Sequence, residues 1–209
     1  MIRLLIFLLG IGMLTLLLVR AWRLKYGNIP KLVLMDRDGV INVDRSDYVK
    51  SRDEFEFVPG AIDAIKILND AKIKVIIVTN QGGIGRDLYT REDLEDIHEY
   101  MKDELAATEA HVDHIFFCAD HPDSPTHRRK PNPGMLEEAL EQTKVRPEQT
   151  HMIGDSVRDM VPAFACGIHR HLVLTGHGEK SLHDPMLKEN FPVQVHENLL
   201  EAVKVILRQ

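Results

Sequence analysis

The chain has 209 residues and a net charge of -6, with 26 Lys and Arg against 32 Asp and Glu. This charge argues against nucleic acid as a partner, because no overall positive field draws the chain to phosphate backbones. The only cysteines, Cys118 and Cys166, are too few for a disulfide framework and fit reduced thiols in the cytosol.

The N-terminal stretch 4–19 contains no charge, Asn, Gln or Pro, and we expect it to insert into a membrane. It spans about 24 Å at ~1.5 Å per residue, so it predicts one short transmembrane helix in an anchor over 1–26. The basic residues after it place the following domain in the cytoplasm. A signal peptide is one alternative, and a mis-assigned start, which leaves a soluble cytoplasmic protein, is another.

After a linker at 27–31, one domain is expected over 32–209. Short apolar runs there alternate with segments of helical periodicity, which predicts an α/β fold, a Rossmann-like parallel sheet with helices on both faces. The predicted strands are 32–36, 73–79, 112–118, 150–154 and 169–174. The predicted helices are 61–70, 91–106, 134–143, 157–165 and 196–207. Thr90 with Asp93, and separately Ser156, are helix-start signals, while 118–133 is expected to be a long loop.

Polar segments follow the predicted strands where parallel sheets bind ligands, beyond the carboxyl ends. Because these ends lie at one edge of the sheet, we expect the segments to form one site. They are Asp36-Arg37-Asp38-Gly39, Thr79-Asn80-Gln81-Gly82, Arg129-Lys130-Pro131 on the loop after the third strand, and Gly154-Asp155-Ser156.

The carboxylates in these segments fit phosphoryl transfer. A carboxylate such as Asp36 is ordinarily ionised at neutral pH, so it can attack phosphorus and form an acyl phosphate. Asp38, two residues on, is placed to protonate the leaving oxygen and later to take a proton from water. Two carboxylates facing a phosphate require a hard divalent cation, so we predict Mg²⁺, with Asp155 completing its site.

The other segments supply groups for the transferred phosphate. Thr79 offers a hydroxyl and Asn80 an amide at the end of the second strand. Lys130 offers a positive charge that offsets the charge on the phosphoryl oxygens and on Asp36.

The ordered motifs resemble the haloacid dehalogenase superfamily over about residues 31–180. Three runs, 36–42, 79–84 and 129–135, are more narrowly similar to the D-glycero-D-manno-heptose 1,7-bisphosphate phosphatase and histidinol-phosphatase branch. The resemblance implies a compact member without a large cap domain. It implies the nucleophile Asp36, the general acid/base Asp38, and Mg²⁺ ligands from Asp36, the Asp38 backbone carbonyl and Asp155. It also implies phosphate or substrate contacts from Thr79, Asn80, Gln81, Arg129 and Lys130. Sugar or second-phosphate contacts are implied for the loop 44–48, which includes Asp44, Asp47 and Tyr48.

The loop after the third strand departs from the pattern of this branch, whose members carry two cysteine-containing pairs that bind zinc. Here the corresponding segments supply only Cys118, His121 and His127. Closed structural zinc sites normally have four ligands, so we expect Mg²⁺ and no zinc.

Several other polar residues have ordinary structural interpretations. Asp159 is expected to be a helix-surface or supporting carboxylate, not a direct metal ligand. The histidines expected to be ordinary surface or turn residues are His98, His111, His114, His169, His171 and His177.

The sequence therefore predicts a monomeric, Mg²⁺-dependent phosphatase that hydrolyses a small phosphorylated sugar through an aspartyl-phosphate intermediate. Heptose 1,7-bisphosphate is the expected substrate, and histidinol phosphate or another small phosphate ester is the alternative. A membrane-tethered binding protein without catalysis is the alternative from another functional class.

Overall fold

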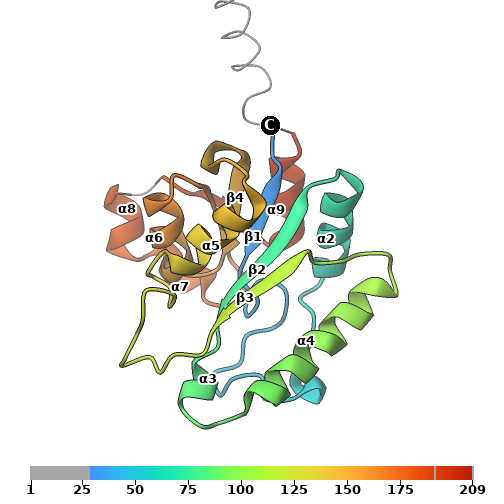
Figure 1. Ribbon diagram of the computed structural model, residues 1–209. Coiled ribbons are helices and arrows are strands. Elements are labelled where there is room, and N and C mark those ends of the chain that lie inside the picture. The colour runs from blue at the N-terminus through green and yellow to red at the C-terminus, as the bar shows by residue number, and fades with distance from the viewer. Residues whose placement is uncertain (1–28, 191, 209) are drawn as a thin grey trace, which may run out of the picture. The chain divides into compact units, whose positions relative to one another are not determined.

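The computed structural model describes residues 29–190 and 192–208, and it places a six-stranded parallel sheet at their centre (Figure 1). The strand order is β3-β2-β1-β4-β5-β6, which is the Rossmann order, so the predicted α/β parallel sheet is confirmed. The strands are β1 (Leu32–Met35), β2 (Lys74–Asn80), β3 (His114–Cys118), β4 (Thr150–Gly154), β5 (His169–Val173) and β6 (Gln194–His196).

Helices cover both faces of this sheet. One face carries α2 (Ala61–Asp70), α4 (Arg91–Ala106) and α9 (Leu199–Ile206), and the other carries α5 (Gly134–Thr143) and α6 (Val157–Ala165). Shorter elements complete the described chain: 3-10 turns at Arg52–Glu54 and Pro147–Gln149, and helices α3 (Gly82–Gly85), α7 (Gly178–Leu182) and α8 (Pro185–Asn190).

Strand β1 lies between β2 and β4, and its four side chains are fully buried. Val33 and Met35 join the core under α2 and α9, whereas Leu32 and Leu34 join the core under α5 and α6. A strand that is covered on both faces must be apolar at every position, which explains its unbroken hydrophobic sequence.

The predicted helix starts at Thr90 and Ser156 are confirmed. Each side chain accepts a hydrogen bond from the backbone of the first turn, and Asp93 and Asp159 complete the two capping boxes. The last helix begins at Leu199, not at 196 as predicted, because residues 194–196 pair with β5 as strand β6. Three residues are too few to show strand periodicity in the sequence.

The predicted membrane anchor at 1–26 lies outside the described residues. Within the part of the chain that the structure describes, no helix is both long enough and apolar enough to cross a membrane.

A chain of hydrogen-bonded histidines runs across β4, β5 and β6. His151 Nδ1 lies 2.9 Å from His171 Nε2, and His171 Nδ1 lies 3.0 Å from His196 Nε2. The surface or turn environment expected for His171 is wrong, because β5 is flanked by two strands and contacts α9, which leaves this side chain fully buried. Burial lowers the pKa of His151 to about 4 and also lowers the pKa of His171 and His196.

These histidines predict loss of stability in mild acid. Their pKa values are lower in the folded than in the unfolded chain, so the unfolded state binds more protons as pH falls through ~6.5. Between pH 7.5 and 5.5, His151 and His171 should each lower the free energy of unfolding by about 1.4 kcal/mol. Urea unfolding of His171→Gln should show a smaller pH dependence than the wild type, and the exposed control His111→Gln should keep it. An identical pH dependence for His171→Gln would contradict this account.

Candidate active site

The turn after β1 brings its carboxylates close to the end of β4. Gly39 has a φ of 80°, and a Cβ atom there would lie 2.2 Å from Asp155 Oδ2. Gly176 closes on the same carboxylate from the other side, where a Cβ atom would lie 2.1 Å away. Only glycine permits such close approach in this backbone conformation, so Asp155 is held directly beside the β1 turn.

Asp36, Asp155 and Asp159 form a cluster of carboxylates. One oxygen of each lies within 4.8 Å of the others, and the described residues contain no other group of three metal-ligating side chains this close. Burial, together with the charge of Asp159, raises the pKa of Asp155 to about 8. Burial also raises the pKa of Asp36 to about 7, although Lys130 acts against it. The expectation that Asp36 has an ordinary pKa is therefore wrong for the protein alone.

The donor set of this cluster fits a hard divalent cation. Buried carboxylate oxygens are the ligands that Mg²⁺ prefers, and a bound cation removes the repulsion that raises these pKa values. Asp36 and Asp155 are thus brought together as predicted.

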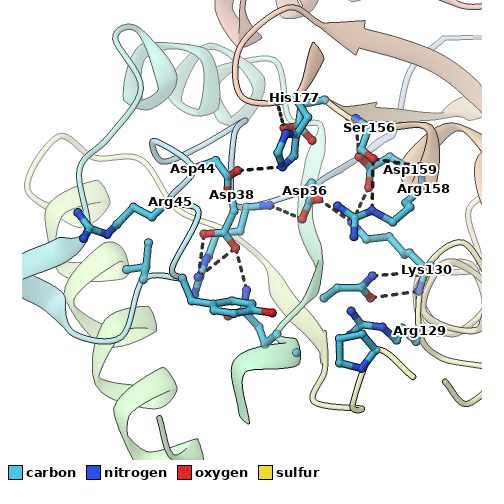
Figure 2. A pocket seen from close by; sticks show the side chains of 18 of the residues that line it. Asp36, Asp38, Asp44, Arg45, Arg129, Lys130, Ser156, Arg158, Asp159 and His177 are labelled. Atoms are coloured by element: carbon cyan, nitrogen blue, oxygen red, sulfur yellow. Dashed lines mark hydrogen bonds and ion pairs between the residues drawn. The ribbon is translucent and has the colours of Figure 1, made fainter. Parts of the chain in front are cut away.

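Lys130 is the buried cation of the site. Its Nζ donates to Asp159 Oδ1 at 2.6 Å, to the backbone oxygen of Val78 at 2.7 Å, and pairs with Asp36 Oδ2 at 2.9 Å. Burial works against its charge, but Asp159 and Asp36 outweigh burial and raise the pKa of Lys130. The side chain therefore stays protonated and faces the carboxylate predicted to be the nucleophile (Figure 2).

Asp159 is fully buried, so its predicted position on the helix surface is wrong. One carboxylate oxygen caps α6 by accepting the backbone N–H of Ser156 at 3.0 Å, and the other accepts from Lys130. Its alternative interpretation, as a supporting carboxylate, agrees with these contacts. The capping-box spacing from Ser156 placed Asp159 at the start of α6 but did not reveal Lys130 as its partner.

Asp38 is surrounded by hydrogen-bond donors. Arg37 Nη2 donates to both carboxylate oxygens at 2.9 and 3.1 Å, Asn42 donates at 3.0 Å and Gln81 at 2.9 Å. Burial favours the neutral acid, but the Arg37 guanidinium and these amides hold the pKa of Asp38 below its usual range.

The buried residue behind Arg37 is His98, whose Nε2 lies 3.3 Å from Arg37 Nη1. Burial lowers the pKa of His98 to about 3, so the ring is neutral and Nε2 can accept from the guanidinium. The surface or turn environment expected for His98 is therefore wrong. Neither Arg37 nor His98 was identified as a site residue from the sequence, since their contact joins the turn after β1 to α4 across 61 residues.

The end of β2 and the residue after it contribute side chains that hydrogen-bond to other parts of the site. Both polar atoms of Asn80 bond to the backbone of Lys130, at 2.9 and 3.1 Å, so this side chain fixes the lysine loop. The Thr79 hydroxyl is buried and accepts from Gln81 at 2.8 Å. Their contacts with phosphate remain predictions.

A cavity of about 420 Å³ opens above these groups. Among the residues predicted to contact substrate, Asp44, Asn80, Gln81, Arg129 and Lys130 line it. Tyr48, from the loop predicted to contact the sugar or the second phosphate, lines it too. So do Arg86, Arg158 and His177, which the sequence did not single out as site residues.

His177 lies in an exposed turn, as predicted, and it also forms part of this cavity wall, a role that the sequence did not reveal. Its Nε2 lies 3.1 Å from Asp44 Oδ2, and its backbone N–H donates to Asp155 Oδ2 at 2.7 Å (Figure 2). The loop after β1 and the loop after β5 therefore meet at the cavity, a contact that only the sheet order creates.

Asp47 does not line the cavity, contrary to its predicted role in sugar or phosphate binding. Its exposed carboxylate pairs instead with Lys50 at 2.8 Å and Arg45 at 3.3 Å. These local cations hold the side chain away from the cavity.

The three residues considered as zinc ligands do not form a metal-binding group. His127 Nε2 lies 2.7 Å from Glu137 Oε2, and His121 Nδ1 accepts from the backbone of Asp123 at 3.2 Å. Cys118 is buried, and burial raises the pKa of its thiol.

Comparison with known proteins gives consistent results. The HAD-hydrolase-like family model matches residues 127–202. The D-glycero-beta-D-manno-heptose-1,7-bisphosphate 7-phosphatase of Neisseria meningitidis serogroup A is 38% identical over 181 residues, covering 86% of this chain and 96% of the relative. The Pseudomonas putida protein of the same name is 40% identical over 152 residues, covering 73% of this chain and 87% of the relative.

A solved structure extends this similarity to three dimensions. The D,D-heptose 1,7-bisphosphate phosphatase of B. bronchiseptica, complexed with magnesium and phosphate, is 37% identical and superposes with a TM-score of 0.80. The match covers 85% of this chain and 98% of that one. Sequence and fold agree over nearly the full length of these relatives, and the chain therefore belongs to the heptose 1,7-bisphosphate phosphatase family of haloacid dehalogenase-like hydrolases.

Proposed function

We propose that this protein is a Mg²⁺-dependent D-glycero-D-manno-heptose 1,7-bisphosphate 7-phosphatase that acts through an aspartyl-phosphate intermediate. The observation that carries the proposal is the placement of Asp36 between the Lys130 ammonium and Asp155, at the floor of the cavity. The names of the relatives at 38 and 40% identity support the substrate.

In the first step, an Asp36 carboxylate oxygen attacks phosphorus and the bond from phosphorus to the sugar oxygen breaks. Asp38, which is protonated when the bound phosphate brings negative charge beside it, gives its proton to that leaving oxygen. Lys130 offsets the negative charge that gathers on Asp36 and on the phosphoryl oxygens. Mg²⁺, held by Asp36, Asp155 and the Asp38 backbone carbonyl, would supply further charge neutralisation when bound.

In the second step, water attacks the phosphorus of the acyl phosphate. Asp38, now ionised, takes the proton from this water, and the bond from phosphorus to the Asp36 oxygen breaks. Inorganic phosphate leaves and the Asp36 carboxylate is restored. The donors around Asp38 favour the ionised form that this step requires.

The cavity wall supports a substrate with a second phosphate. Arg129 and Arg158 both line it, and burial, with the charge of Arg158 nearby, lowers the pKa of Arg129. Arg129 donates to the backbone oxygen of Asp120 at 3.0 Å, which leaves further guanidinium donors for an anion. Two neighbouring arginines suit a phosphate group beyond the one that is transferred.

The first test removes the nucleophile. Asp36→Asn should lower kcat on heptose 1,7-bisphosphate on the order of 10³-fold or more, because an amide cannot form the acyl phosphate. Its circular dichroism spectrum should match that of the wild type. Asp103→Asn, on the exposed side of α4, is the control and should remain fully active. An active Asp36→Asn enzyme would exclude the proposed intermediate.

The second test measures cation binding without turnover. MgCl₂ should raise the Tm of the full-length protein, because at 100 times Kd a ligand stabilises the folded state by about 2.7 kcal/mol. The Asp155→Asn variant should lose most of this response, and Asp103→Asn should keep it. Equal Mg²⁺ responses in all three proteins would place the cation elsewhere.

The third test concerns the second phosphate. Arg158→Gln should raise KM for the bisphosphate about 10- to 100-fold, as expected for a lost charge-assisted hydrogen bond. Its KM for a sugar monophosphate should change little. Arg128→Gln is the matched control, since Arg128 is exposed and pairs with Glu138 outside the cavity. A similar increase for both substrates would show that Arg158 does not recognise the second phosphate.

A further inference from the structure

The Gln81 side chain joins two residues of the proposed catalytic site. Its Nε2 donates to Asp38 Oδ2 at 2.9 Å and to Thr79 Oγ1 at 2.8 Å. Its Oε1 accepts from the Tyr89 hydroxyl at 2.7 Å. All three hydrogen bonds are made by a side chain that is almost completely buried.

The orientation of this amide matters because its two ends have opposite hydrogen-bonding character. If the amide were turned over, its oxygen would face the Asp38 carboxylate and the donor shared with Thr79 would be lost. The Tyr89 hydroxyl favours the productive orientation, since it supplies a donor to the oxygen. Burial raises the pKa of Tyr89, so the hydroxyl keeps the proton that it donates.

The position of Tyr89 is fixed by the backbone around it. A Cβ atom on Gly83 would lie 2.1 Å from Tyr89 Cε1, so the ring packs directly on α3 at a place where only glycine fits. Thr90, the next residue, caps α4. Tyr89 does not line the cavity. Its hydroxyl reaches the catalytic site through Gln81, and its ring makes a tilted contact with Tyr48 of the cavity wall, with centroids 6.3 Å apart.

We propose that Tyr89 is a positioning residue that locks the Gln81 amide, so that Gln81 holds Asp38 and Thr79 in their working positions. The inference rests on the proposed function, because it assigns Asp38 to proton transfer and Thr79 to phosphate binding. Tyr89 acts on both steps of the reaction without contacting the substrate.

The test uses the full-length Tyr89→Phe variant, which loses only the hydroxyl. Its kcat on heptose 1,7-bisphosphate should fall about tenfold or more, with a smaller change in KM, because proton transfer from Asp38 depends on its position. With p-nitrophenyl phosphate the leaving group departs without a proton. The first turnover should then stay fast while hydrolysis of the acyl phosphate slows, and a burst of p-nitrophenol should appear.

A double-mutant cycle identifies the route of the effect. Gln81→Met removes the amide and should itself impair turnover; adding Tyr89→Phe to it should cause no further loss. Tyr100→Phe, a change of the same kind at a partly buried tyrosine packed against the core on α4, is the control and should leave both kinetic constants unchanged.

The results of these experiments can contradict the positioning role of Tyr89 without contradicting the proposed phosphatase function. If the wild type hydrolyses phosphate esters but Tyr89→Phe lowers only Tm, with unchanged kcat and no burst, the positioning role is wrong. Independent, additive losses in the double mutant would also overturn it, because Tyr89 would then act by another route. A wild type without phosphatase activity would overturn both proposals.

Discussion

The buried ammonium of Lys130 is the interaction on which the rest of the site depends. Three acceptors surround it, contributed by the turn after β1, by β2 and by α6. Without this charge, Asp36 and Asp159 would be two buried carboxylates with no ammonium between them, and their repulsion would raise the pKa of Asp36 further. Asn80 supports this lysine by accepting from the backbone N–H of Lys130 and donating to the backbone oxygen of Lys130. The lysine therefore has a structural and an electrostatic function at once.

The topology of the sheet explains why this lysine can meet its partners. The chain order reverses at β1, whose neighbours are β2 on one side and β4 on the other. Residues that follow these strands thus come together from positions more than 100 residues apart. Gly39 and Gly176 then permit a backbone approach that places Asp155 beside Asp36. The fold brings the carboxylates into a cluster whose repulsion a divalent cation relieves.

Most strands and helix starts could be predicted because short, local sequence patterns identify them. An unbroken apolar run such as 32–35 identifies a strand covered on both faces, and a capping pair such as Thr90 with Asp93 identifies a helix start. The environments of Asp159, His98 and His171 were not predictable in this way. Each depends on a partner distant in the chain, and a lone histidine or aspartate carries no local sign of burial. Strand β6 was not predicted, because its three residues are too few to show the alternating pattern of a strand.

The sequence by itself determined the chemistry, since the motif residues at Asp36, Asp38, Lys130 and Asp155 stand at strand ends that any parallel sheet gathers at one edge. It also determined the family, through the order and spacing of these motifs. Only the tertiary structure decided how the groups are held. The donors around Asp38, the raised pKa of Asp36, the meeting of His177 with Asp44 and the exclusion of Asp47 from the cavity all depend on contacts through space. Electrostatic environments arise from neighbours in three dimensions, and those neighbours come from remote segments of the chain.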